Sequence, residues 1–217
     1  MPRSALALLV ALCAGCLPYS VGQTAGTLPA GENAVATTIQ FVPVFEPREE
    51  GEPPTEDGLY GSAVPQFDGV VRFGLDERTE ATARLVGGVG ASVAVKRLLS
   101  GDETGPATAV LGGVGVLNGG QHAHGELTFI VSGAERNPLV PYAGVRAFQT
   151  VPIGRGAVSD APTIGGFVGL RLGSLDFGAS PEIGVFYDPP ALGLRESSVV
   201  VVPSLTFHGR EILRYLY

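Results

Sequence analysis

The chain has 217 residues, of which 45% are hydrophobic and only 16% are charged, with 32 glycines and 17 prolines. Its net charge of -7 excludes the basic surface that nucleic-acid binding requires, so no nucleic acid is expected as a partner. The glycines and prolines follow no three-residue period, which excludes collagen, and the many aliphatic residues argue against a disordered chain. A folded domain with a large apolar area is therefore expected.

Residues 1–15 have the composition of an export signal. Arg3 precedes an apolar run over residues 5–12, which is too short to span a bilayer, and the small pair Ala14 and Gly15 follows. The stretch LCAGC, residues 12–16, resembles the lipobox of bacterial lipoproteins, which implies a lipoprotein-type signal peptide and lipidation at Cys16. The alternative is an ordinary signal peptide with two cysteines, since Cys13 stands where lipoboxes usually have an aliphatic residue.

No cysteine follows Cys16, so the exported chain has no disulfide and must be stable through its core or the membrane. Residues 16–33 are small, polar and rich in glycine, and we interpret them as a flexible tether. Membrane lipid is the predicted partner, and a lipidated Cys16 would anchor the chain in it. If the domain itself spans the membrane, Cys16 is expected to pin the tether on the periplasmic side.

From residue 34 to residue 207 the sequence repeats one pattern, in which segments of about ten residues alternate apolar or small side chains with polar ones. Turn-forming residues separate these segments, and residues 208–217 form a tail. The period of two predicts strands at residues 34–45, 64–75, 79–86, 90–98, 107–117, 122–131, 139–150, 163–173, 177–187 and 198–207. The predicted fold class is all-β, with about ten strands (8–12).

Each predicted strand has one face without charge and one face with isolated charged residues. In residues 79–86, for example, Ala83 and Leu85 oppose Glu80 and Arg84. A soluble sandwich carries a denser charged surface, whereas strands with apolar side chains facing outward are typical of a membrane barrel. We therefore predict a single antiparallel up-and-down β-barrel over residues 34–207, with a soluble barrel or sandwich as the alternative.

The predicted connections differ in length. Those at residues 46–63, 151–162 and 188–197 are long, whereas 76–78 and 174–176 are very short, as expected for outer loops and periplasmic turns. The connections near 87–88 and 118–120 are short where this scheme permits length. Residues 46–58 are rich in acidic side chains, which indicates a solvated loop or, alternatively, a site that captures cations or a basic partner.

The hairpin VRFGLDERTEATARLVGGVG, residues 71–90, has a strand that ends at a tight polar turn and a second strand that restarts with Thr and Glu. In this hairpin pattern, and in the aromatic end of its last strand at Phe207, the chain resembles the small bacterial outer-membrane β-barrel proteins. The resemblance covers residues 34–207 and implies a bacterial outer-membrane protein that is structural or a narrow passive pore. The contrasting hypothesis is a soluble periplasmic barrel lipoprotein that binds a partner or a small apolar ligand.

The polar faces direct a set of charged side chains into the predicted lumen. Buried charges must pair, so we interpret them as a structural ion-pair network that fills the barrel, with a narrow channel or a small-ligand pocket as the alternative. The predicted network comprises Asp68, Arg72, Glu80, Arg84, Lys96, Glu126, Arg146, Arg171 and Glu182.

His122 and His124 share a strand face with Glu126, and we interpret the two histidines as a candidate pH-sensitive pair. A metal site is not predicted, because no third histidine lies on a clearly adjacent strand. The sequence has no Gly-x-Ser-x-Gly, His-Glu-x-x-His or Walker motif, so we expect no catalytic residue, no cofactor and no enzyme activity. An enzyme would require a hydroxyl nucleophile beside His122 or His124.

Overall fold

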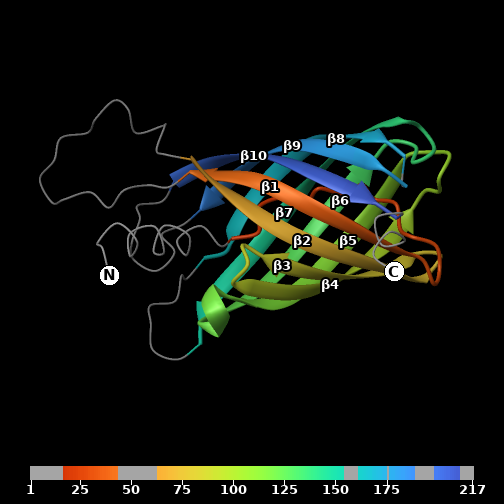
Figure 1. Cartoon of the computed structure of the whole chain (residues 1–217). Coiled ribbons are helices and arrows are strands. Elements are labelled where there is room, and N and C mark those ends of the chain that lie inside the picture. Colours follow the sequence, from red (N-terminus) through yellow and green to blue (C-terminus); the bar gives the residue numbers. More distant parts are fainter. Residues whose placement is uncertain (1–16, 44–62, 154–160, 175, 189–197, 211–217) are drawn as a thin grey trace, which may run out of the picture.

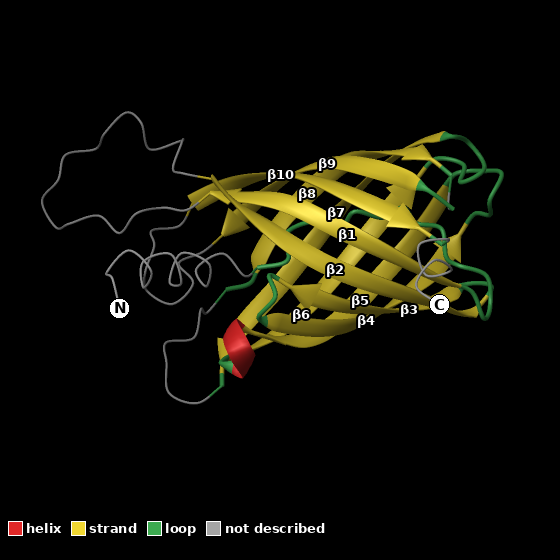
Figure 2. Cartoon of the chain, viewed as in Figure 1, coloured by secondary structure: helices red, strands yellow, loops and turns green. Residues whose placement is uncertain are grey.

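The structure, a computed structural model, describes residues 17–43, 63–153, 161–174, 176–188 and 198–210. Ten antiparallel strands in chain order close into one barrel, which confirms the predicted fold class (Figures 1 and 2). The strands are β1 (Asn33–Pro43), β2 (Ala63–Asp76), β3 (Thr79–Val86), β4 (Gly90–Ser100), β5 (Ala107–Leu117), β6 (His122–Ser132), β7 (Leu139–Pro152), β8 (Thr163–Gly173), β9 (Gly178–Asp188) and β10 (Ser198–Gly209). Within the described ranges, no helix is long and apolar enough to cross a membrane.

The strand bounds follow the period-two pattern of the sequence. β3, β5 and β8 have the predicted bounds, and the other strands differ from the prediction by one or two residues at an end. The barrel extends slightly beyond residues 34–207, because β1 begins at Asn33 and β10 continues to Gly209. β1 pairs with both β2 and β10, so the sheet has no free edge.

The two ends of the barrel carry different connections. One end, here the long-loop end, has connections at residues 44–62, 87–89, 118–121, 153–162 and 189–197, which include all three predicted long loops. The other, the short-turn end, has connections at residues 77–78, 101–106, 133–138 and 174–177. β1 starts and β10 ends at the short-turn end, where Val35 is paired with Gly209. The acidic residues 46–58 lie outside the described residues.

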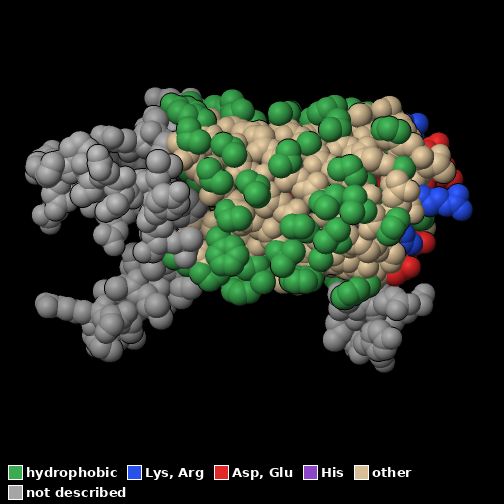
Figure 3. All heavy atoms as spheres, turned by 90° about the horizontal axis from the view of Figure 1, so that it is seen from above, with side chains coloured by type: hydrophobic (Ala, Val, Ile, Leu, Met, Phe, Trp, Pro, Cys, Tyr) green, Lys and Arg blue, Asp and Glu red, His purple; other side chains and the backbone are tan. Residues whose placement is uncertain are grey.

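The outer wall is apolar along the strands. Leu85, Val93 and Val168 are 64%, 59% and 62% exposed, although each lies within a strand. Figure 3 shows apolar side chains distributed over the wall, with charged side chains gathered at the short-turn end. Among the strand residues whose burial is described, Asp76 and Arg97 are the exposed charged ones, and both lie near that end. The uncharged faces predicted from the sequence therefore point outward.

Residues 17–32 run inside the ring of strands, so they are not the flexible tether that their composition predicted. Figure 1 shows this part of the chain, at the red end of the colour range, crossing the interior before β1 begins. Tyr19, Ala25 and Leu28 are each no more than 1% exposed. We call residues 17–32 the lumen segment. Its small and polar composition suits a polar lumen as well as it suits solvent, which is why composition alone indicated a tether.

A lumen closed by the N-terminal segment

The lumen segment crosses the barrel from the long-loop end to the short-turn end. Tyr19 packs in an apolar cluster at the long-loop end, formed with Val42, Phe148, Phe186, Val200 and Val202. At the other end the Gly31 N–H donates to the Gly74 carbonyl, and the Gly74 N–H donates to the Glu32 carbonyl, both at 2.9 Å. The chain then reverses direction into β1. The interior is therefore occupied over its length by the chain itself.

A second apolar cluster lies nearer the short-turn end. Ala25 of the lumen segment is fully buried there against side chains from β5, β6, β7 and β8. The cluster comprises Ala25, Ala107, Ala109, Ile130, Tyr142 and Phe167. The lumen segment thus contributes one buried apolar side chain to each cluster, and polar layers occupy the space between them.

Acidic side chains of the barrel bind the backbone N–H groups of the lumen segment. The Glu182 carboxylate accepts the N–H groups of Val21 and Gly22, both at 2.9 Å. Glu80 accepts the N–H of Leu28 at 3.1 Å. A closed sheet offers no edge to which an enclosed segment could pair, so these carboxylates supply the partners that its buried backbone needs.

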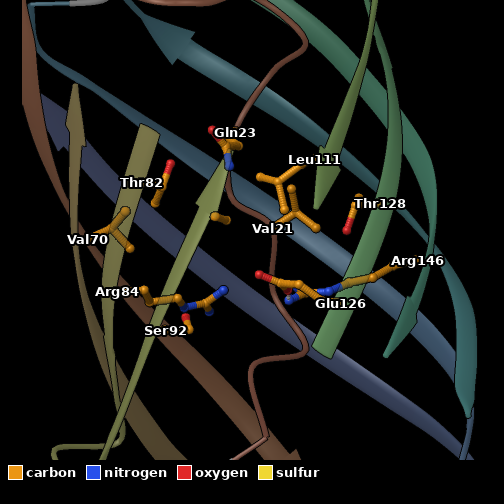
Figure 4. Close-up of a pocket in the computed structure, with 11 residues that line it drawn as sticks. Val21, Gln23, Val70, Thr82, Arg84, Ser92, Leu111, Glu126, Thr128 and Arg146 are labelled. Atoms are coloured by element: carbon orange, nitrogen blue, oxygen red, sulfur yellow. Dashed lines mark hydrogen bonds and ion pairs between the residues drawn. The ribbon is translucent and has the colours of Figure 1, made fainter. Parts of the chain in front are cut away.

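Cationic side chains bind the carbonyl groups of the same segment. Lys96 Nζ donates to the Gly26 carbonyl at 2.6 Å and to the Thr24 carbonyl at 3.3 Å. Arg84 and Arg146 both donate to the Ser20 carbonyl, at 2.8 and 2.9 Å. In Figure 4 these two arginines reach toward the segment from opposite sides of the lumen. The wall therefore recognises the segment mainly through its backbone.

All nine charged residues predicted for the lumen are buried or partly buried inside the barrel. Eight of them are in ion pairs, whereas none of the ion pairs found among the described residues includes Glu182. The pairs are Arg72 with Glu80 at 2.6 Å, Lys96 with Glu80 at 3.4 Å, Arg84 with Asp68 at 2.5 Å, Arg146 with Glu126, and Arg171 with Glu135 at 2.9 Å.

Glu135 is a lumen residue that the strand pattern of the sequence did not predict. Glu135 lies in the turn between β6 and β7, yet it is only 7% exposed, and its carboxylate accepts the N–H of Gly26 at 3.1 Å. With Glu135 included, these lumen charges comprise five cations and five anions. The alternation of strand faces could not predict Glu135 as a lumen residue, because a turn residue belongs to neither face.

Gln40 is a second lumen residue that the sequence did not predict. It lies fully buried on β1, where its side-chain oxygen accepts the Ser20 N–H at 3.0 Å and its side-chain nitrogen donates to the Leu17 carbonyl at 3.0 Å. Its place in the lumen follows from the alternation of β1, in which Thr38 and Gln40 share the inward face. Its uncharged amide did not mark Gln40 as a lumen residue, because the lumen was predicted from charged side chains.

Gly22 fits the lumen because it has no side chain. Its φ of +61° lies in the left-handed region, and a Cβ placed there would stand 2.1 Å from Thr206 Oγ1. Gly31 also has a positive φ, of +79°, but a Cβ at that position would meet no atom within 4 Å. Among the glycines of the segment, Gly22 therefore lies closest to the wall, on the side of β10.

Little space is left beside the middle of the lumen segment, whereas a hollow of about 470 Å³ lies beside Gly26 and Pro29 at the short-turn end. A cavity of about 30 Å³ remains between Val21, Gln23 and the walls of β3 and β6, and Figure 4 shows the side chains around it. A single water molecule needs about 10–15 Å³ of such space. The cavity has room for water, and it is too small for an apolar ligand of the kind that soluble barrels carry.

The histidine pair lies toward the long-loop end. His124 is buried, and its Nε2 stands 3.9 Å from Glu126, whereas His122 contacts the Asn118 side chain at 3.3 Å. Neither ring nitrogen of His124 has a hydrogen-bond partner in the part of the chain that the structure describes. Those residues also contain no group of three or more His, Cys, Asp or Glu arranged to hold a metal ion. The pH-sensitive role of the pair stays a prediction.

Comparisons with known proteins found a distant structural likeness and no match in sequence. No family model matches the sequence, and no curated protein matches it. A search of solved structures found similarity to the crystal structure of the outer membrane protein OprG from Pseudomonas aeruginosa. The sequence identity is 14% and the TM-score is 0.32, over 86% of this chain and 97% of that chain. A likeness this distant carries no functional inference, so function has to be inferred from the barrel's own residues.

Proposed function

We propose that the protein is a transmembrane β-barrel of the bacterial outer membrane, and that its own N-terminal segment closes its lumen. Its role is structural, and it is not a continuously open pore. The observation that carries this proposal is the direction of the two strand faces. Apolar side chains cover the outside along the strands, whereas ten charged residues and a peptide segment occupy the inside.

The outer wall supports the membrane location. Large apolar side chains exposed over a whole barrel would make a soluble protein aggregate, whereas lipid accepts them. Aromatic side chains lie toward both ends of the wall, as in the aromatic girdles of membrane barrels. Phe41 and Tyr187 are exposed toward the long-loop end, and Phe73, Phe177 and Phe207 toward the short-turn end.

The interior argues against the contrasting hypothesis of a soluble barrel that binds a small apolar ligand. Such a barrel needs an apolar cavity of about 300–1,000 Å³. The cavity beside Val21 and Gln23 measures about 30 Å³ and is lined in part by Arg84, Glu126 and Arg146. The hollow of about 470 Å³ at the short-turn end is large enough, but its lining includes the charged residues Arg72, Glu77, Arg78, Asp102, Glu103 and Glu135. The same filling argues against a passive pore that stays open.

The membrane location is tested by the behaviour of the protein in detergent. A folded membrane barrel migrates differently on a gel before and after heating, and it precipitates when detergent is removed. We expect both results for the chain that follows the signal peptide. A monomeric form of residues 17–217 that stays soluble without detergent would overturn the membrane location.

The closed lumen is tested by conductance in planar bilayers. The intact barrel is expected to show no steady conductance, and a variant that lacks residues 17–29 is expected to conduct. Adding a synthetic peptide with the sequence of residues 17–29 should close the truncated barrel again, which controls for damage to the wall. If the truncated barrel folds but does not conduct, the segment is not what closes the lumen.

Lipidation of Cys16 belongs to the same proposal, and Cys16 lies outside the described residues. Because the barrel itself would hold the protein in the membrane, Cys16→Ser is expected to leave it membrane-integrated and heat-modifiable. A soluble lipoprotein would instead be released from the membrane by this substitution. Mass spectrometry of the mature N-terminus would measure whether the acyl groups are present.

A further inference from the structure

We infer that the mature chain is threaded through its own barrel, so that the residue-17 end of the lumen segment is presented on the outside of the cell. The inference rests on the proposed function, because it needs a barrel that spans the outer membrane. It also replaces the expectation that Cys16 pins a tether on the periplasmic side. Three features of the structure carry it.

The first feature is the direction of the lumen segment. Leu17, the first described residue, packs against the apolar cluster that contains Tyr19, Phe148 and Phe186. Phe148 pairs with the first residue of β8, and that residue borders the connection 153–162 at the long-loop end. From there the contacts move steadily along the barrel, until Leu28 reaches Glu80 near the short-turn end. The segment therefore begins at the long-loop end.

The second feature is the length of the segment. Its 16 residues could extend to about 50 Å, because an extended chain spans about 3.3 Å per residue. The hydrocarbon core of a bilayer is about 30 Å thick. The segment is therefore long enough to cross the full thickness of the membrane inside the lumen and still turn back into β1.

The third feature is the density of contacts that hold the segment in this direction. Charged side chains at three levels bind its backbone: Arg84 at Ser20, Glu182 at Val21 and Gly22, and Glu80 at Leu28. Gln40 holds both Ser20 and Leu17 close to the long-loop end. These contacts match N–H groups to carboxylates and carbonyl groups to cations, so they hold the segment in the observed direction and register.

The orientation of the barrel in the membrane determines on which side the residue-17 end lies. Membrane barrels have short turns on the periplasmic side and long loops outside the cell, which places the long-loop end outside. Residue 16 is joined to Leu17 by one peptide unit, about 3.8 Å between Cα atoms. Any acyl group that residue 16 carries would therefore enter the outer leaflet of the outer membrane, next to the long loops.

The test is an epitope tag inserted between residues 16 and 17 of the full chain. Matched tags at residue 193, in a long loop, and between residues 77 and 78, in a short turn, serve as controls for the two sides. Antibody is added to intact cells and to permeabilised cells, and heat-modifiable migration shows that each tagged chain has folded. We expect the tags at 16/17 and 193 to bind antibody on intact cells, and the tag at 77/78 to bind only after permeabilisation.

Two results would overturn the inference in different ways. If the tag at 193 binds on intact cells but the tag at 16/17 binds only after permeabilisation, the barrel stands and the threading is wrong. If all three tags are found in the soluble periplasmic fraction, the proposed function fails and the inference fails with it. Should a tag prevent folding, Leu17→Cys in a Cys16→Ser background, probed with a membrane-impermeant maleimide on intact cells, gives the same readout with a single side chain.

Discussion

Replacing Glu182 with glutamine is expected to open the lumen while leaving the barrel folded. Glu182 binds the lumen segment through both carboxylate oxygens, which accept the N–H groups of Val21 and Gly22 at 2.9 Å. Glutamine keeps one acceptor oxygen and places an NH₂ group against the other N–H, so one bond is replaced by a contact between two donors. None of the described ion pairs includes Glu182, and the substitution therefore leaves no cation without its partner there.

The size of the effect follows from the bond that is lost. A hydrogen bond to a charged group contributes about 1.5–3 kcal/mol, and an unmatched buried donor adds a similar cost. A loss of about 2–3 kcal/mol from the closed state corresponds to a roughly 30- to 150-fold larger open population, since 1.36 kcal/mol is a factor of ten. Glu182→Gln should therefore raise the open probability in planar bilayers by this factor.

Glu126→Gln is the matched control, because it makes the same chemical change to a lumen carboxylate that binds no backbone group of the segment among the contacts found. Glu126 pairs with Arg146, and removing one partner of a buried pair costs about 3–5 kcal/mol. Arg146 still donates to the Ser20 carbonyl. We expect Glu126→Gln to lower the temperature at which the barrel unfolds, measured by the change in gel migration, while the lumen stays closed.

The conductance of the two variants separates the possible causes of the closed state. Glu182→Gln with the conductance of the unmodified barrel would mean that this carboxylate does not hold the segment. Equal opening by Glu126→Gln and Glu182→Gln would mean that the total lumen charge, and not binding of the segment, sets the closed state.

Two further substitutions probe the fit and the mobility of the segment. Gly22→Ala should open the lumen, because its Cβ would stand 2.1 Å from Thr206 Oγ1. Gly31→Ala should cost only the backbone strain of about 1–2 kcal/mol and leave the conductance unchanged. Equal conductance in the two variants would contradict the close fit at Gly22. Ser20→Cys with Ser204→Cys should form a disulfide, since the two hydroxyl oxygens are 3.0 Å apart, and should keep the lumen closed in the Glu182→Gln background until a reductant is added. Opening that does not depend on the reductant would show that the segment need not leave for ions to pass.

The barrel wall could be predicted from the sequence because its side chains alternate between two very different surroundings. Leu85 meets the outside and Glu80 meets the lumen, and this contrast repeats in strand after strand. Alternation also fixes which side each residue faces, because a shift of one residue would exchange the two faces. The same contrast brought eight of the nine predicted lumen charges into ion pairs in the structure.

The lumen segment could not be predicted, because nothing in its composition separates a peptide inside a polar lumen from a peptide in water. Ser20, Gln23 and Thr24 suit both surroundings, and the apolar contacts depend on single side chains such as Tyr19. The one indication of a further occupant of the lumen was the charge balance of the wall. A lumen with five cations but only four anions on its strands left room for a further partner, and part of that partner is the backbone of the segment.

The seam between β1 and β10 has a consequence for the order of assembly. It joins strands from the two ends of the described chain, with Gln40 opposite Ser204, and pairings over such a sequence separation form late because they close the largest loop. The lumen segment is continuous with β1, so it is already present when β10 arrives. It can serve as an internal template around which the last strand closes, and no finished barrel has to be threaded afterwards.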